Sequence, residues 1–180
     1  MLQVRMTERM ALKMDLSLEC ESMGKGNLTL NQQLTISFPE GFRVMDEAER
    51  SKLNVLGKGP GECITDPERH VVMSFGWKAV GLAALLLSAK DAAGKAESDI
   101  CKAMSGYGYH LGGFLSREVG GEKAEGFAFD YDAQGIRMYA ESFVVKHGKV
   151  FYYLHVYTRE ALKDENVKLW TELLAEAVWA

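Results

Sequence analysis

Cysteine, proline and long hydrophobic runs are scarce in this sequence. The three cysteines, Cys20, Cys63 and Cys101, lie far apart and form no C-x-x-C pair, which argues against a disulfide framework and a tetrathiolate metal site. The longest apolar run, at 79–89, is shorter than the roughly 20 residues that a transmembrane helix needs. The first residues carry charges before any apolar run develops, unlike a signal peptide. We therefore expect a cytoplasmic protein without a membrane span, in which 79–89 is a buried helix.

Positive charge is also in short supply. The chain has 25 acidic and 21 basic residues, giving a formal charge of -4, and the basic residues are scattered along it. Binding to nucleic acid depends on a basic surface that neutralises phosphates, and no such stripe is present. We expect no nucleic-acid partner. With 180 residues, of which 47% are hydrophobic, the chain is large enough for a continuous core and is expected to form one domain over 1–180.

The N-terminal part shows the alternation of apolar and polar residues that is typical of strands. It runs from 10 to 20, and after the turn-forming residues 24–27 it resumes from 28 to 38. This pattern predicts a hairpin over about 10–38. Pro39 ends the second strand, Gly41 allows a sharp turn, and Phe42 is expected to pack back over the junction.

Helices and further strands follow in separate blocks. Asp46 and Glu49 have the spacing of a capping box, which predicts a short helix over about 46–53. Two strands are expected around the turn at 66–69, the second over 70–77, and then helices over about 79–105 with a break or bend at Gly94. A strand meander over about 109–158 and a helix over about 160–177 complete the chain. This order predicts an α+β fold, a sandwich with a mainly antiparallel sheet.

Motifs that would carry catalysis or bind a cofactor are missing or incomplete. The glycine-rich stretches at 57–61 and 106–114 lack the spacing and the strand-to-helix context of nucleotide-binding loops. The histidines show no metal-ligand spacing, and Asp130 and Asp132 are better explained as one solvated strand face. We expect no cofactor and no metal, and a function other than catalysis.

Aromatic residues on or beside the predicted strands are the best candidates for a binding surface. They would form an apolar patch if one face of the sheet is open, and would be core residues if helices cover both faces. The candidate binding residues are Trp77, Tyr107, Tyr109, Tyr139 and Tyr153.

The motif SFPEGF at 37–42, which closes the hairpin and leads into a short helix, resembles the Pro-Glu-Gly-aromatic signature of the PsbP-like superfamily. That superfamily includes PsbP of photosystem II, the Ran guanine-nucleotide release factor, DcrB-like lipoproteins and chaperones of type VI effectors. Pro39, Gly41 and Phe42 carry the match, with Phe42 where tryptophan is commoner, and the order of elements agrees over 28–180. The resemblance implies an α/β/α sandwich in a bacterial branch of binding and assembly proteins, and no photosystem or Ran-binding residue can be transferred.

Two hypotheses about function follow. The first is a non-catalytic binding or scaffold protein that holds a protein partner, or a second copy of itself. The alternative is a small enzyme or ligand-binding protein whose site is assembled by the fold from His110, His70, and Cys63 or Cys101. A pocket that brings at least two of these residues together would favour the alternative.

Overall fold

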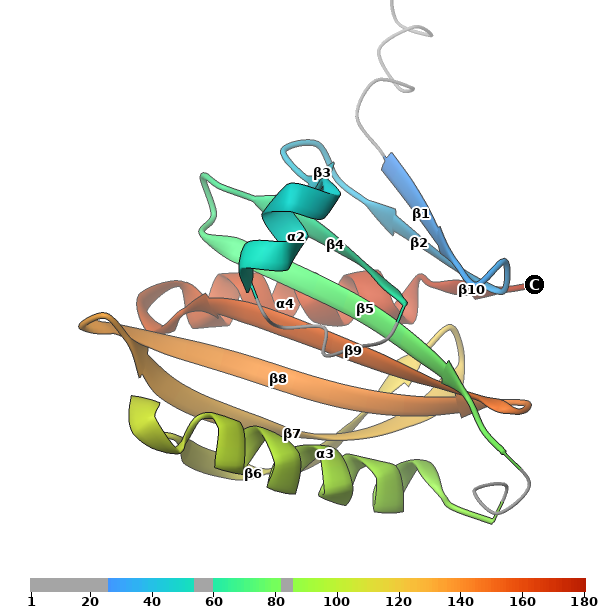
Figure 1. Ribbon diagram of the computed structural model, residues 1–180. Coiled ribbons are helices and arrows are strands. Elements are labelled where there is room, and N and C mark those ends of the chain that lie inside the picture. The colour runs from blue at the N-terminus through green and yellow to red at the C-terminus, as the bar shows by residue number, and fades with distance from the viewer. Residues whose placement is uncertain (1–25, 54–59, 82–85) are drawn as a thin grey trace, which may run out of the picture.

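The computed structural model describes residues 26–53, 60–81 and 86–180 (Figure 1). In chain order, the described elements are β1 (Gly26–Leu30), β2 (Leu34–Phe38), β3 (Arg43–Val44), α2 (Glu47–Leu53), β4 (Gly61–Asp66), β5 (Val71–Ala79), α3 (Ala89–Ala103), η2 (Ser105–Tyr107), β6 (His110–Val119), β7 (Glu122–Ala133), β8 (Ile136–His147), β9 (Val150–Arg159), η3 (Glu160–Leu162), α4 (Lys163–Ala175) and β10 (Val178–Trp179).

A seven-stranded antiparallel sheet forms the centre of the structure. Its strand order is β3-β4-β5-β9-β8-β7-β6, so the strands of the meander, β6 to β9, are neighbours. Tight turns join them, and each turn contains residues with a positive φ, such as Gly120, Gly135 and Gly148. Glycine adopts this conformation without steric cost, which is why these positions interrupt the strand pattern. The meander predicted over 109–158 is confirmed.

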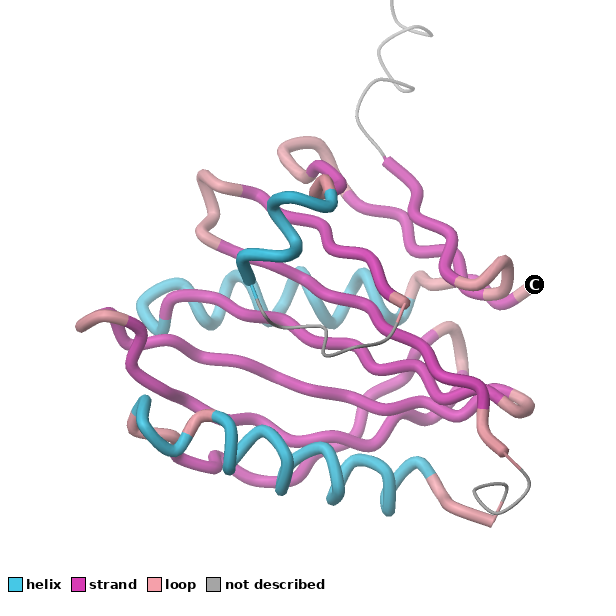
Figure 2. The backbone as a smooth tube through the Cα atoms, viewed as in Figure 1, coloured by secondary structure: helices cyan, strands magenta, loops and turns pink. Residues whose placement is uncertain are grey.

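Helices and a small sheet cover the two faces of the large sheet. α3 packs on β7 and β8 on one face, and α4 packs on β9 and β6 on the other, next to a three-stranded sheet of order β1-β2-β10 (Figures 1 and 2). The largest core cluster lies between the large sheet and the layer of α4 and β2, and it contains Phe75, Leu154, Trp170, Leu34 and Ile36. The predicted α+β sandwich with a mainly antiparallel sheet is confirmed.

The N-terminal hairpin differs from the prediction. The described strands β1 and β2 pair with each other across a turn at Asn31 and Gln32, whose φ values are +49° and +57°. The segment 28–38 is therefore two strands and not one. Three turn residues, 31–33, separate Leu30 from Leu34. The buried apolar residues therefore stay at even positions on both sides of the turn, and the alternation in the sequence shows no interruption there. The segment 10–20, predicted to be the first strand, lies outside the described residues.

The apolar run at 79–89 was predicted to be a buried helix, and its described residues do not form one. Ala79 ends β5, α3 begins at Ala89, and the side chain of Leu86 is 95% exposed. Residues 82–85 lie outside the described part of the chain. The helix starts at Ala89 because Ser88 and Asp91 form a capping box, with the Asp91 amide donating to Ser88 Oγ at 3.1 Å. α3 then continues through Gly94 without the expected break.

The second capping box, predicted for α2, is present. The Glu49 amide donates to Asp46 Oδ1 at 2.8 Å, and the Asp46 amide donates to Glu49 Oε2 at 3.1 Å. Phe42 is buried in the main core cluster, as expected from its place after the turn. The cap and the packing of Phe42, both predicted from the residues in and after the SFPEGF motif, are thus confirmed.

The C-terminal segment adds a strand that the sequence did not predict. α4 ends at Ala175, and Val178 and Trp179 pair with Thr35 and Leu34 of β2. The Trp179 indole stacks on His147 at 4.3 Å between ring centroids and donates to the Val119 carbonyl at 2.9 Å. The end of the described chain is therefore held by three different elements.

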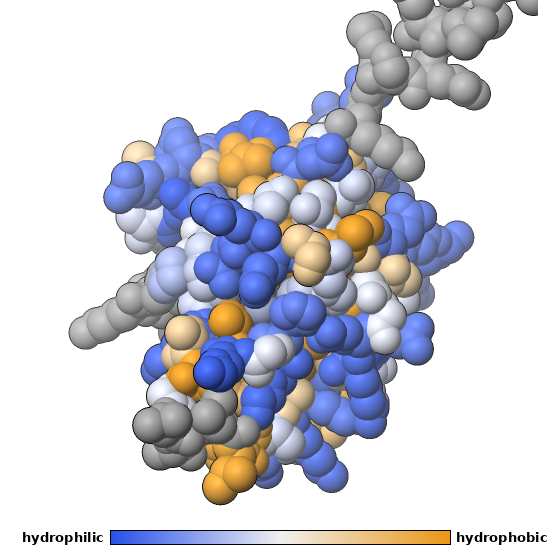
Figure 3. Space-filling view, turned by 90° about the vertical axis from the view of Figure 1, so that its right-hand side faces the viewer, coloured by the Kyte–Doolittle hydropathy of each residue, from blue (hydrophilic) through white to orange (hydrophobic). Residues whose placement is uncertain are grey.

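None of the described helices combines the length and the apolar character that crossing a bilayer requires. On the face drawn in Figure 3, hydrophobic groups lie in small separate areas among hydrophilic ones.

His155 is a titratable side chain placed in the interior of the sheet. It lies on β9 between Ser74 of β5 and Ser142 of β8 in the strand register. Among the described residues, His155 Nδ1 has no hydrogen-bond partner. Burial lowers the pKa of His155 from 6.5 to about 4, because the charged imidazolium loses its hydration.

We expect the free energy of unfolding to decrease by up to about 3 kcal/mol as the pH falls from 6.5 to about 4, because the unfolded chain takes up a proton at His155 that the folded chain does not. Denaturant unfolding across this pH range measures the effect. Carboxylates add their own pH dependence, so the readout is the difference between the wild type and His155→Gln. The control His70→Asn, at an exposed turn, should keep the wild-type slope, and equal slopes in all three proteins would contradict the prediction.

Candidate functional site

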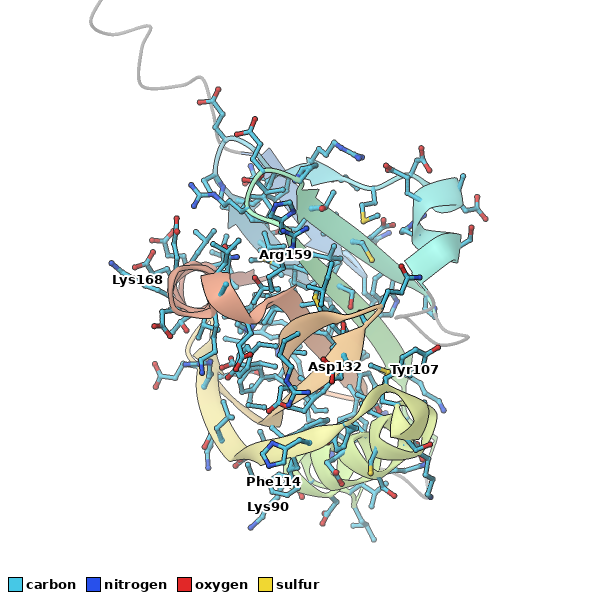
Figure 4. The ribbon with its side chains drawn as sticks, turned by 90° about the vertical axis from the view of Figure 1, so that its left-hand side faces the viewer. Lys90, Tyr107, Phe114, Asp132, Arg159 and Lys168 are labelled. Carbon is cyan, nitrogen blue, oxygen red and sulfur yellow. The ribbon has the colours of Figure 1, made fainter. Side chains whose placement is uncertain are left out.

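An open cleft of about 890 Å³ lies where the β2–β3 turn, the β4–β5 turn and the start of α4 meet. We call it the Gly41 cleft. Figure 4 views the molecule from the side on which the β4–β5 turn and the start of α4 lie. The cleft is lined by Glu40, Gly41, Arg43, Asp66, Pro67, Glu68, Arg69, Leu162, Glu165 and Asn166. The Pro-Glu-Gly motif at 39–41 thus contributes two residues, Glu40 and Gly41, to one wall.

Gly41 is required in this wall for two reasons. Its φ is +96°, a conformation that L side chains rarely adopt. A Cβ at this position would also lie 2.7 Å from Asp66 Oδ2, which is inside van der Waals contact. The buried ring of Phe42 fixes the turn on its core side. The turn therefore presents backbone, and not a side chain, to the carboxylate of Asp66.

Asp66 fixes the neighbouring wall, next to Gly41. Its buried carboxylate accepts hydrogen bonds from the amides of Glu68 and Arg69, at 3.0 and 3.2 Å to Oδ1. Asp66 Oδ2 pairs with Arg69 Nε at 3.2 Å. An aspartate that bonds to amides two and three residues ahead stabilises a turn, and Pro67 in the next position sets the required φ. The β4–β5 turn is consequently a rigid part of the cleft.

α4 supplies the third wall through Glu165 and Asn166. Glu165 Oε1 accepts a hydrogen bond from Arg69 Nη1 at 2.7 Å, so Arg69 bridges two carboxylates. Asn166 is 1% exposed, and its Nδ2 donates to the Arg69 carbonyl at 3.0 Å and to Thr158 Oγ1 at 2.7 Å. Asn166 Oδ1 has no hydrogen-bond partner among the described residues. The amide therefore links the turn, β9 and α4 around the cleft.

The cleft has an excess of negative charge. Four carboxylates line it, those of Glu40, Asp66, Glu68 and Glu165, against the two guanidinium groups of Arg43 and Arg69. Both cations are already paired. Arg43 donates to both carboxylate oxygens of Glu49, at 2.7 and 2.6 Å, which raises the pKa of Arg43 above its usual value.

Within the described residues, no ion pair involves Glu40 or Glu68, and both side chains are exposed. Leu162 and Pro67 are the main apolar groups in the lining. Such a surface suits a cationic polar group better than an apolar ligand.

The structure separates the five aromatic residues that the sequence suggested for binding. Trp77 packs on the core cluster on the α4 side, and Lys163 of α4 lies over the Tyr139 ring at 4.9 Å from its centroid. Tyr109 and Tyr153 pack against the clusters under α3. Tyr107, in η2, is 54% exposed. The five residues form no common surface, and none of them lines the Gly41 cleft.

Two of these tyrosines have hydrogen bonds that hold them in place. The Tyr139 hydroxyl donates to Glu141 Oε1, and the Tyr109 hydroxyl donates to Glu97 Oε1, both at 3.0 Å. Burial is the main cause that raises the pKa of each tyrosine, and the neighbouring carboxylate raises it further. Both hydroxyls therefore stay protonated at neutral pH.

The residues of the alternative hypothesis do not converge. Cys63 lies on β4 and His110 on β6, which are five strand positions apart, or roughly 24 Å at the usual strand spacing. His110 Nδ1 instead contacts Asp130 Oδ2 at 3.0 Å, His70 lies in the β4–β5 turn, and Cys101 lies on α3. In the part of the chain that the structure describes, no three His, Cys, Asp or Glu side chains are grouped to hold a metal ion.

Sequence reasoning missed most of the cleft. The segment Asp66-Pro67-Glu68-Arg69 was predicted as a turn, and an aspartate before proline is the signal for the hydrogen bonds that Asp66 makes. Asn166 gave no signal, because it is a single polar residue in a helix and its partner Arg69 is 97 residues away in the chain.

Comparison with known proteins shows the fold. No protein-family model matches the chain, and a search of curated protein sequences found no significant relative. Among solved structures, the chain is similar to cyanobacterial PsbP (CyanoP) from Synechocystis, with a TM-score of 0.62 and 15% identity over 87% of this chain and 93% of that chain. It is also similar to the Ran-binding protein Mog1p of Saccharomyces cerevisiae, with a TM-score of 0.54 and 12% identity over 87% and 95%. The resemblance to the PsbP-like superfamily is confirmed as a likeness of fold.

We expect Gly41→Ala to lower the free energy of unfolding by about 1 to 3 kcal/mol, because alanine is strained at this positive φ and its Cβ would collide with Asp66. The matched control is Gly94→Ala, in α3, where nothing lies within 4 Å of an added Cβ. This control should raise stability by about 0.5 to 1 kcal/mol, because alanine favours the helix. Denaturant unfolding compares the three proteins, and a neutral Gly41→Ala would show that the turn is not constrained.

We expect Cys63 to react slowly with iodoacetamide in the folded protein at pH 8. Burial is the main cause that raises its pKa to about 11, so the thiolate that reacts is a very small fraction of the thiol. Alkylation should be roughly a hundredfold slower or more than in urea. Mass spectrometry of the peptide that contains Cys63 gives the alkylation rate. Similar rates in buffer and in urea would contradict the prediction and would make Cys63 a candidate nucleophile again.

Proposed function

We propose that this protein is a non-catalytic binding protein for a protein partner, and that the Gly41 cleft receives a basic segment of that partner. The observation that carries the proposal is the pair of exposed carboxylates, Glu40 and Glu68, which have no cationic partner among the described residues. A lysine or arginine side chain of the partner would complete the charge balance of the cleft.

The rigidity of the cleft supports this function. Glu68 lies in the β4–β5 turn, which Asp66 and Asn166 hold through the backbone of Glu68 and Arg69. Glu40 precedes Gly41, whose conformation leaves no room for a side chain. Since both carboxylates project from fixed backbone, binding would cost little ordering of the protein.

The fold likeness supports a protein partner over a small molecule. Mog1p, which shares the fold at a TM-score of 0.54, is a Ran-binding protein. Although they form no common surface, we also propose individual contacts at the aromatic residues that the sequence suggested, of which Tyr107, at 54% exposed, is the most accessible: Trp77, Tyr107, Tyr109, Tyr139 and Tyr153. The proposal includes a cytoplasmic location, which agrees with the free thiols of Cys63 and Cys101.

We expect the double variant Glu40→Lys and Glu68→Lys to lose binding to basic peptides. Random peptides displayed on phage are selected against the wild type and against the variant. The wild type should enrich peptides that carry lysine or arginine, and their binding should weaken with added salt, because the contacts are charge pairs in solvent. Both residues are exposed, so the folded structure should persist in the variant, which circular dichroism can verify.

The matched control is the double variant Glu172→Lys and Glu176→Lys. It makes the same change in net charge, and both residues are exposed near the far end of α4. Glu176 lies roughly 15 Å along the helix from Asn166. This control should select the same peptides as the wild type. If all three baits enrich the same peptides, or if none enriches basic ones, the cleft is not the binding site.

A further inference from the structure

β6 is a long edge strand of the large sheet. The sheet ends in β3 on one side, which has only two residues, and in β6 on the other, which has ten. β6 pairs with β7 along one side. In a strand, every second residue directs its backbone N–H and C=O groups to a given side. Among the described residues, no strand pairs with the outer side of β6, so the donors and acceptors there have no partner strand in that part of the chain.

The strand register shows which residues point their backbone groups outward. Val119 and Glu122 are paired and flank the two-residue turn Gly120-Gly121, whose φ values are +56° and +82°. In such a hairpin the pair next to the turn is hydrogen bonded, and bonded pairs then recur at every second residue. Gly113, Leu115, Arg117 and Val119 therefore bond to β7. Phe114, Ser116 and Glu118 direct their N–H and C=O groups away from it.

Two features set the ends of this outward-facing segment, and its middle residue follows from them. At one end the register shifts between Leu111 and Gly113, and Gly113 has a φ of +135°. At the other end the Gly120 amide donates to the Leu174 carbonyl at 2.9 Å, and the Val119 carbonyl accepts from Trp179. Regular edge backbone thus runs from Phe114 to Glu118, and Ser116 is its middle residue.

The side chains on this edge are accessible. Ser116 and Glu118 are exposed, and Phe114 is 62% exposed although its ring packs edge-on against Phe127 at 6.1 Å between centroids. α3 covers β7 and β8, and Figure 4 shows Phe114 at the border of the sheet beside that helix. On the opposite face, Arg117 holds the strand in place by bonding the buried Glu141 through Nε at 3.0 Å and Nη2 at 2.8 Å.

We propose that the β6 strands of two copies of this chain pair antiparallel about a twofold axis at Ser116. In this register Ser116 faces Ser116 of the second copy, and Phe114 faces Glu118 of the second copy. Each outward N–H then meets an outward C=O. The two large sheets become one continuous sheet across the dimer.

The regular edge segment 114–118 is symmetric about Ser116, so a second copy paired antiparallel about that residue matches its whole length. Glu118 is the one charged residue among the three outward ones, and this register places it opposite a phenyl ring. A register centred on Glu118 would bring two carboxylates together, and one centred on Phe114 would run into the irregularity at Gly113. The contact spans five residues, or about 17 Å, so we infer a weak dimer that forms with increasing concentration. This proposal is independent of the Gly41 cleft.

Sedimentation equilibrium of the full chain, over a range from about 10 µM to about 1 mM, tests the pairing. The wild type should show a monomer–dimer equilibrium. Ser116→Pro removes an outward N–H without touching the bonds to β7, so it should remain folded and monomeric. The control Ser116→Thr keeps the N–H and should dimerise like the wild type.

A second pair of variants keeps the test decisive if Ser116→Pro disturbs the fold. Phe114→Glu would place a carboxylate opposite Glu118 of the second copy, and should weaken dimerisation at least tenfold at low salt. Phe114→Lys would place an ammonium group there and should preserve dimerisation. A wild type that is monomeric at every concentration, or a dimer that neither Ser116→Pro nor Phe114→Glu weakens, would overturn the proposal.

Discussion

The packing of α4 on the centre of the large sheet is the contact on which the remaining structure depends. Trp170 and Phe75 are both fully buried, with their ring centroids 6.0 Å apart. Removing a buried tryptophan side chain typically costs about 3 to 5 kcal/mol, a large part of the stability of a small protein. This contact fixes α4 against β5. It therefore also fixes Asn166, one turn earlier in the helix, at the Gly41 cleft, and Leu173 and Leu174 beneath the β1–β2 hairpin.

The two proposed binding regions follow from the order of strands in the sheet. The β4–β5 turn that forms the cleft lies close to the β3 edge, and β6 forms the opposite edge. β3 is protected from pairing by its length of two residues and by the charged Arg43, which binds Glu49. β6 is ten residues long, and over 114–118 its charged residues are Arg117, which binds the buried Glu141, and Glu118. The two proposals therefore concern opposite ends of the large sheet.

Local signals in the sequence were sufficient for much of the fold. The capping box at Asp46 and Glu49, the turn at 66–69 and the strand meander over about 109–158 each depend on residues that are close in the chain, and the structure contains all three. The errors arose where a local pattern was compatible with two structures. The turn at Asn31 leaves the apolar residues at even positions, so the two strands resemble one continuous strand. The apolar run at 79–89 resembles a core helix in composition, although Leu86 is exposed. Composition does not reveal whether a neighbour is present to bury such a run.

The candidate site was less predictable, because it depends on contacts between distant parts of the chain. Gly41 was recognised as a turn residue, but its approach to Asp66 is a tertiary contact. The aromatic residues were predicted from type alone, and the side of the sheet on which each one lies is set by the strand register. A shift of one residue would exchange the two faces. The periodicity of the sequence shows that residues alternate between the two faces of a strand, but it does not show which helix packs on each face.

β10 has a consequence for how the chain folds during its synthesis. The small sheet joins β2, near the start of the described chain, to Val178 and Trp179, which are made more than 130 residues later, since β2 ends at Phe38. The hairpin of β1 and β2 can form as soon as it emerges from the ribosome, but the side of β2 that binds β10 has to wait until Val178 and Trp179 appear. Contacts of such long sequence separation slow folding. During that interval, a chaperone that shields β2 would have to release it before β10 could bind.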